Sequence, residues 1–108
     1  KYQFVDGGIF SNLPVKETKD LGVDKVLALR FKLKSPRKQK TIYNITMQSL
    51  DLMTENLIRE SVNASTSVLE IDLREVKPFN IKKLEFCYKE GYIQTLDNIL
   101  RIKKELAG

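Results

Sequence analysis

Residues 25–34 read Lys-Val-Leu-Ala-Leu-Arg-Phe-Lys-Leu-Lys, and this stretch decides the fold class. Val26 to Leu29 form a continuous apolar run, which is typical of a β-strand covered on both faces. From Arg30 onward basic and apolar residues alternate strictly, so the strand is expected to leave the core there. A strand of this kind needs helices on both sides of its sheet, and it therefore predicts an α/β fold.

Helical patterns lie on both sides of this strand. Residues 15–21 are expected to form a short helix that ends at Gly22, because glycine suits a helix C-cap. Thr41 is the expected N-cap of a helix that runs to about Ala64. Apolar residues recur in it at three- and four-residue spacing, which predicts a core-facing stripe. The stripe comprises Ile42, Ile45, Ser49, Leu50, Met53, Leu57 and Ile58. A lipid-facing role for Met47, Leu52 and Met53 is the alternative.

The rest of the chain continues the alternation of strands and helices. A strand is expected over 68–73, with Leu69, Ile71 and Leu73 on one face. A turn follows at Pro78-Phe79-Asn80. The C-terminal region is expected to form two helical pieces, residues 82–89 and a second run after Gly91.

Length and composition limit the class of protein. A chain of 108 residues with 42% hydrophobic content forms one domain or part of one, near the lower limit for a sheet covered on both faces. Cys87 is the single cysteine, which excludes an internal disulfide, and without histidine nothing activates it as a nucleophile. No apolar stretch reaches the length of a membrane span and no signal-peptide pattern is present. We expect a cytoplasmic protein, with peripheral membrane contact left open.

Positive charge is concentrated in one segment. The net charge is +5, and residues 30–40 hold six basic residues and no acid. The segment has no recognisable nucleic-acid module, so no nucleic acid is expected as a partner. A solvated loop is the default interpretation, and contact with an anionic surface is the functional one. The residues that would make that contact are Lys32, Lys34, Arg37, Lys38 and Lys40.

A second informative stretch lies at the start of the sequence, where residues 2–14 read Tyr-Gln-Phe-Val-Asp-Gly-Gly-Ile-Phe-Ser-Asn-Leu-Pro. Tyr2 to Val5 are expected to form a buried strand that ends at Asp6. The two glycines leave no side chain between this carboxylate and an approaching group. Asp-Gly is also the strongest two-residue hairpin signal, and these residues alone leave both interpretations open.

The longer run 5–15 resembles the Asp-Gly-Gly box of the patatin-like phospholipases, which reads D-G-G-x-x-x-N-x-P. Residues 21–29 are similar to the leucine-glycine-x-aspartate turn and strand that follow the box in that family. Glu90-Gly91-Tyr92 resembles the end-of-domain helix of its bacterial members. The resemblance runs from Lys1 to about Leu100, and the positions that match the box are Asp6, Gly7, Gly8, Asn12 and Pro14.

The resemblance implies a three-layer α/β/α acyl hydrolase domain that cleaves lipid or fatty-acyl esters with a Ser-Asp dyad, without metal or cofactor. Asp6 would be the dyad base, and Gly7, Gly8, Asn12 and Pro14 would shape its loop. The family's serine lies in a G-x-S-x-G elbow behind a glycine-rich loop, and this sequence contains neither.

We therefore expect residues 1–108 to be the C-terminal portion of one patatin-like domain, inactive alone. The alternative is a noncatalytic α/β domain that binds an anionic membrane surface or a partner through residues 30–40. The oligomeric state stays open.

Overall fold

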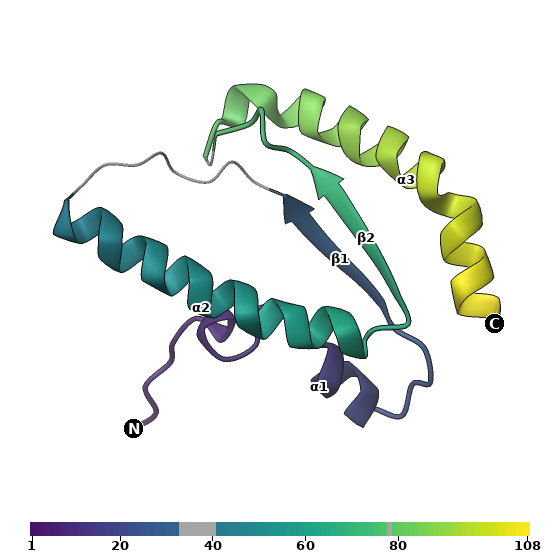
Figure 1. Cartoon of the computed structure of the whole chain (residues 1–108), viewed down its shortest axis with the longest axis horizontal. Coiled ribbons are helices and arrows are strands. Elements are labelled where there is room, and N and C mark those ends of the chain that lie inside the picture. The colour runs from purple at the N-terminus through teal and green to yellow at the C-terminus, as the bar shows by residue number, and fades with distance from the viewer. Residues whose placement is uncertain (33–40, 78) are drawn as a thin grey trace.

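The computed structural model describes residues 1–32, 41–77 and 79–108, and it is a mixed α/β structure (Figure 1). Two strands, β1 (Leu27–Lys32) and β2 (Ser67–Asp72), form a small parallel sheet. The helices are α1 (Val15–Asp20), α2 (Ile42–Ala64) and α3 (Leu84–Ala107), with 3₁₀ turns η1 (Gly7–Ile9) and η2 (Ile81–Lys83). The predicted α/β class, both of these strands and the helices at 15–21 and 41–64 are thus confirmed.

The two faces of the sheet are covered by different helices. On one face Val15 of α1 packs with Val26 and Ala28. On the other, Leu69 and Ile71 pack against Ile102 of α3. Figure 1 accordingly shows the strands lying between α3 and the pair α1 and α2. The alternation predicted for β2 is confirmed, because Leu69 and Ile71 are buried while Glu70 is exposed.

Helix α2 has the predicted bounds but lacks the predicted buried stripe. Its N-cap is Thr41, whose hydroxyl accepts a hydrogen bond from the Asn44 amide at 3.3 Å. None of its 23 residues is buried, so the prediction that its apolar stripe faces the core is wrong. A two-stranded sheet is too narrow to cover the whole length of such a helix.

Three further expectations are corrected. Residues 2–5 form no strand, and Tyr2 and Phe4 are 91% and 92% exposed, because no neighbouring strand pairs with them. Leu27 and Leu29 are about half exposed, so β1 is not covered on both faces along its length. The C-terminal region is one continuous helix through Gly91, since a single glycine weakens a helix without ending it.

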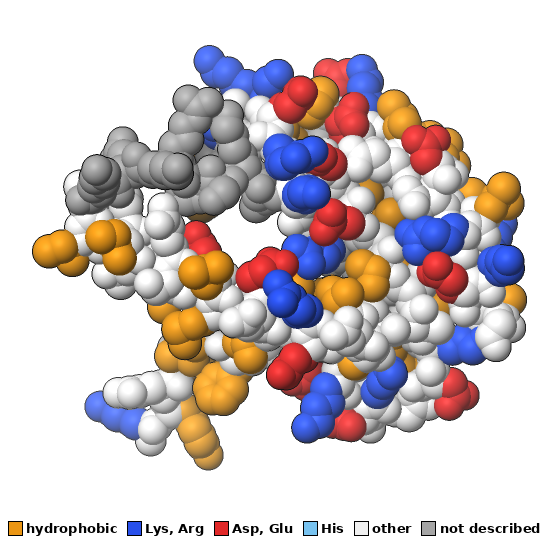
Figure 2. Space-filling model, viewed as in Figure 1, with side chains coloured by type: hydrophobic (Ala, Val, Ile, Leu, Met, Phe, Trp, Pro, Cys, Tyr) orange, Lys and Arg blue, Asp and Glu red, His pale blue; other side chains and the backbone are white. Residues whose placement is uncertain are grey.

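The described chain exposes more surface than a closed domain of its mass. Its accessible surface is 9473 Å² for 12.5 kDa, whereas about 6,200 Å² is typical of a folded monomer. Its radius of gyration is 16.3 Å, against about 13 Å for a compact domain of this length. Figure 2 shows hydrophobic side chains gathered along α2 and the N-terminal segment. Among the described helices, none combines the length and the apolar character that crossing a bilayer demands.

Candidate functional site

The Asp6 loop, residues 6–14, holds its carboxylate in a local turn. Asp6 caps η1, and its Oδ1 accepts a hydrogen bond from the Gly8 amide at 2.8 Å. The Asp6 carbonyl accepts another from the Ile9 amide at 3.2 Å. Within the described chain Oδ2 has no hydrogen-bond partner, and the residue is exposed. One carboxylate oxygen is therefore fixed while the other is free to accept a proton or a hydrogen bond.

Gly8 and Asn12 adjoin this carboxylate. A Cβ added at Gly8 would lie 3.3 Å from Asp6 Oδ1 and 3.8 Å from Asn12 Oδ1. The first of these distances is tighter than an ordinary contact, so a side chain at Gly8 would push against the capping oxygen. At Gly7 the same position is open. The structure thus gives a steric reason for the second glycine of the box only.

The exit of the loop is fixed by α1. Pro14 precedes the helix, and its carbonyl accepts hydrogen bonds from the Thr18 hydroxyl at 2.6 Å and the Thr18 amide at 3.1 Å. The Ser11 hydroxyl donates to Glu17 at 3.1 Å. Val15, directly after Pro14, is buried against the sheet. Pro14 therefore connects an exposed loop to a helix anchored in the core.

The basic segment is described only at its start. Arg30 donates to Glu55 of α2 at 3.1 Å and forms an ion pair with Glu70 of β2 at 3.1 Å. The Nε of Arg30 is buried and its N–H is not aligned for a hydrogen bond, so the Glu70 contact is electrostatic. Lys32 also lies 3.7 Å from Glu70. Lys34, Arg37, Lys38 and Lys40 lie outside the described residues.

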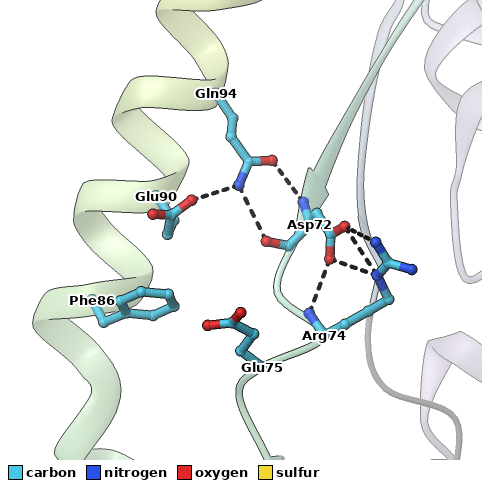
Figure 3. Close-up of a pocket in the computed structure, with 6 residues that line it drawn as sticks. All are labelled: Asp72, Arg74, Glu75, Phe86, Glu90 and Gln94. Atoms are coloured by element: carbon cyan, nitrogen blue, oxygen red, sulfur yellow. Dashed lines mark hydrogen bonds and ion pairs between the residues drawn. The ribbon is translucent and has the colours of Figure 1, made fainter.

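A groove opens where β2 ends, between the following loop and α3 (Figure 3). Its volume is ≈ 700 Å³, and Asp6 is not among its lining residues. We call it the strand-end groove. Among the described residues, its lining contains acidic, amide, guanidinium and phenyl groups and no hydroxyl or thiol nucleophile. The lining residues are Asp72, Arg74, Glu75, Phe86, Glu90 and Gln94.

Gln94 joins α3 to the end of β2 in this groove. Its Oε1 accepts a hydrogen bond from the Asp72 amide at 2.8 Å, and its Nε2 donates to the Asp72 carbonyl at 3.1 Å. The same Nε2 donates to Glu90 at 2.9 Å, as Figure 3 shows. One side-chain amide thus satisfies both backbone groups of Asp72, as a neighbouring strand would.

The carboxylate of Asp72 turns away from Gln94 toward Arg74. The Arg74 guanidinium donates to both of its oxygens, at distances from 2.6 to 3.0 Å, and the Arg74 amide donates at 3.1 Å. These hydrogen bonds lower the pKa of Asp72 from 3.8 to about 2, and the side-chain contacts with Arg74 have the largest effect, followed by the backbone contact. At the other end of β2, the Ser67 hydroxyl and the Arg101 guanidinium donate to the Glu105 carboxylate and lower its pKa, with the larger effect from Ser67.

The structure brings together the residues of the Asp6 loop and leaves Lys32 apart, paired with Glu70 on the sheet. Gln94 was not predicted from the sequence, because a glutamine on an amphipathic helix carries no distinguishing pattern. Across the described ranges, no three acidic or cysteine side chains are grouped as a metal ion would require. No protein-family model matches this chain, and no solved structure matches its fold.

Proposed function

We propose that this chain is the aspartate-bearing C-terminal portion of a patatin-like lipid acyl hydrolase, with Asp6 as the base of a Ser-Asp dyad. The observation that carries the proposal is the exposed Asp6 carboxylate, with Oδ1 held by the Gly8 amide and Oδ2 unengaged in the described chain. It lies within the spaced set Asp6, Gly7, Gly8, Asn12 and Pro14, on which the resemblance rests.

The free oxygen suits the proton transfer that such a dyad requires. The serine hydroxyl, supplied by the rest of the domain, would give its proton to Asp6 Oδ2 as its oxygen attacks the ester carbonyl. The proton would then pass to the alcohol that leaves. Water would release the fatty acid from the acyl-serine in a second step. Asp6 would accept a proton from that water and return it to the serine oxygen as the acyl–oxygen bond breaks. Gly8 would hold Oδ1 throughout.

The surface of the chain supports the proposal that it belongs to a larger domain. About 3,300 Å² is exposed beyond what is typical of a monomer of this mass. Parallel sheets occur almost only where both faces are covered, and here Leu27, Leu29 and Phe31 are about half exposed. The remaining strands and helices of a three-layer α/β/α domain would cover these residues and α2.

The test compares Asp6→Asn with Asp20→Asn in the whole domain. Asp20 is an exposed aspartate at the end of α1 and serves as the matched control. We expect Asp6→Asn to lower hydrolysis of a p-nitrophenyl fatty-acyl ester by at least about 100-fold, since a positioned base contributes that much or more. Asp20→Asn should keep full turnover, and both should melt like the parent. Full turnover in Asp6→Asn would remove Asp6 from the dyad.

The noncatalytic alternative has less support from the described residues. Arg30 is neutralised by Glu55 and Glu70, and Lys32 is close to Glu70. Basic side chains that are already paired with acids on the protein contribute less to binding an anionic surface. We therefore keep the acyl hydrolase as the proposed function.

A further inference from the structure

A fully exposed phenylalanine lies in the loop between β2 and α3. The side chain of Phe79 is 100% exposed, and its φ of 64° lies in the left-handed region that bulky side chains avoid. The Asn80 amide donates to the Lys77 carbonyl at 3.2 Å, and the Ile81 amide donates to the Phe79 carbonyl at 3.1 Å. Backbone hydrogen bonds thus hold the loop in a conformation that keeps the ring in solvent. Strain around an exposed apolar side chain is typical of a binding surface.

Three more apolar side chains continue this surface along the start of α3. The 3₁₀ turn η2 runs directly into α3, and residues three apart in a 3₁₀ turn or four apart in an α-helix share a face. Ile81, Leu84 and Tyr88 have this spacing, and all three are exposed. Phe86 and Glu90 lie on the opposite side of the helix, where they line the strand-end groove. The apolar row therefore points away from the groove.

Three lysines border the apolar row, namely Lys77, Lys82 and Lys83, and all are exposed. Among the residues that the structure describes, no ion pair links them to an acid. Lys83 lies over the Phe86 ring, with its Nζ 5.2 Å from the centroid, and this contact leaves its charge in place. Glu85 is already engaged by a lysine of the next turn at 2.8 Å. Positive charge without a neutralising partner thus adjoins exposed apolar side chains.

This combination of charge and apolar exposure selects the occupant. We call the group the Phe79 surface, and it comprises Phe79, Ile81, Lys82, Lys83, Leu84 and Tyr88. A protein that covered it would have to supply acids, because burying an unpaired ammonium group is costly. An anionic bilayer supplies phosphates and carboxylates in its headgroup layer and accepts apolar side chains beneath them. Lysine stems can lie along apolar groups while their ammonium groups stay in that layer.

We propose that the Phe79 surface docks this chain on an anionic lipid bilayer, with the Phe79 ring among the acyl chains and the lysines among the headgroups. Tyr88 then lies at the boundary, where a ring with a polar end is favoured. The surface follows β2 and lies across the sheet from α2 (Figure 1). It therefore adjoins the carboxyl end of the parallel strands, the edge at which α/β sheets bind their ligands.

This docking deepens the proposed function, because an acyl hydrolase that takes membrane lipids must bring its site to the bilayer. Only that significance rests on the proposed function, since the binding itself follows from exposure and charge. The two fail separately. Vesicle binding is measured on the 108-residue chain without any turnover, and Asp6→Asn should bind vesicles like the parent chain.

The first test is cosedimentation of Phe79→Gly with vesicles that contain phosphatidylcholine and phosphatidylserine in equal parts. Glycine suits the positive φ at this position, so the variant should unfold in urea no earlier than the parent chain. We expect its dissociation constant for the vesicles to rise at least about tenfold, because the ring no longer leaves water on binding.

Phe4→Gly is the matched control, because Phe4 is equally apolar and 92% exposed in the N-terminal segment. It should leave the dissociation constant unchanged. An equal loss of affinity in both variants would show that exposed apolar side chains bind wherever they lie, and would overturn the proposal. Full affinity in Phe79→Gly would overturn it as well.

The second test removes charge. Lys82→Gln with Lys83→Gln should weaken vesicle binding at least about tenfold, since each lysine near an anionic surface contributes a factor of about five. Lys103→Gln with Lys104→Gln is the control, because these are two adjacent exposed lysines at the other end of α3. It should change the affinity little. Equal effects of the two pairs would overturn the proposal.

Two further arms identify the surface that is bound. Binding of the parent chain should weaken as salt is raised, and it should be lost on vesicles of phosphatidylcholine alone. Equal affinity for neutral vesicles would overturn the anionic bilayer as the occupant. No association of the parent chain with the anionic vesicles would also overturn the proposal, and would leave an acidic protein as the partner.

Discussion

At the residue scale, Asp72 and Arg74 form an ion pair held by several hydrogen bonds. The two residues are two positions apart at the end of β2, and the arginine contacts the carboxylate with its guanidinium and its backbone amide. Both contacts favour the ionised carboxylate, and together they lower the pKa of Asp72 to about 2. The pair is solvent-exposed, so it changes the pKa of Asp72 but contributes little to the total folding stability.

This pairing gives a prediction for the pH dependence. A carboxylate with a lowered pKa in the folded state contributes stability that is complete above its unfolded pKa, near 3.8, and is lost as pH falls toward 2. Arg74→Ala should return the pKa of Asp72 to near 3.8, as measured by carboxyl ¹³C NMR. It should also remove the part of the acid-induced loss of folding stability that this pair causes.

Lys89→Ala is the matched control, because it removes an exposed ion pair, with Glu85 at 2.8 Å, on another element. It should leave the titration of Asp72 near 2. A titration near 2 in Arg74→Ala as well would show that the arginine is not the cause.

At the element scale, two glycines have opposite roles. Gly22 follows α1 with φ +90°, in the left-handed region that side chains avoid. Gly91 lies inside α3 and has open space where a Cβ would be. The sequence predicted an ending at both, and only the backbone conformation distinguishes them.

Substituting alanine at each glycine tests this difference. Gly22→Ala should destabilise the chain by about 1 kcal/mol, because alanine is strained at this φ. Gly91→Ala should stabilise it by about 0.5–1 kcal/mol, because alanine is the better helix former. Urea unfolding followed by circular dichroism measures both. A destabilising Gly91→Ala would mean that α3 is not continuous through residue 91.

At the scale of the whole molecule, uncovered apolar surface is the dominant feature. Helix α2 buries none of its residues, and its exposed side chains include Ile45 and Met53. Figure 2 shows hydrophobic side chains gathered along α2, and exposed apolar patches mark interaction faces in folded proteins.

Dye binding provides a measurement of that surface. The chain should bind anilinonaphthalene sulfonate strongly, and Ile45→Gln with Met53→Gln should reduce the fluorescence at least twofold without loss of helical circular dichroism. Lys16→Gln with Lys19→Gln, on the exposed part of α1, is the control and should leave the fluorescence unchanged. Equal fluorescence in all three proteins would contradict an uncovered apolar face on α2.

The sequence by itself determined the elements that local periodicity and caps encode. The strand near 25–34, the strand near 68–73, the helix capped by Thr41 and the special role of Gly22 follow from residues close together in the chain. The spaced box from Asp6 to Pro14 likewise identified the loop whose carboxylate the structure leaves exposed. These features depend on backbone preference and on spacing, which a linear sequence carries directly.

Only the tertiary structure decided which apolar faces are covered and which strand edge is closed. The stripe on α2 has the period of a buried face, yet the sheet it would cover is two strands wide. Gln94 and Arg101 close the edge of β2 through contacts with residues 22 and 33 positions away. Burial and the pairing of strand edges depend on surfaces that distant parts of the polypeptide supply. The periodicity of apolar residues indicates only that a helix or strand could bury one face, and not whether a partner surface covers it.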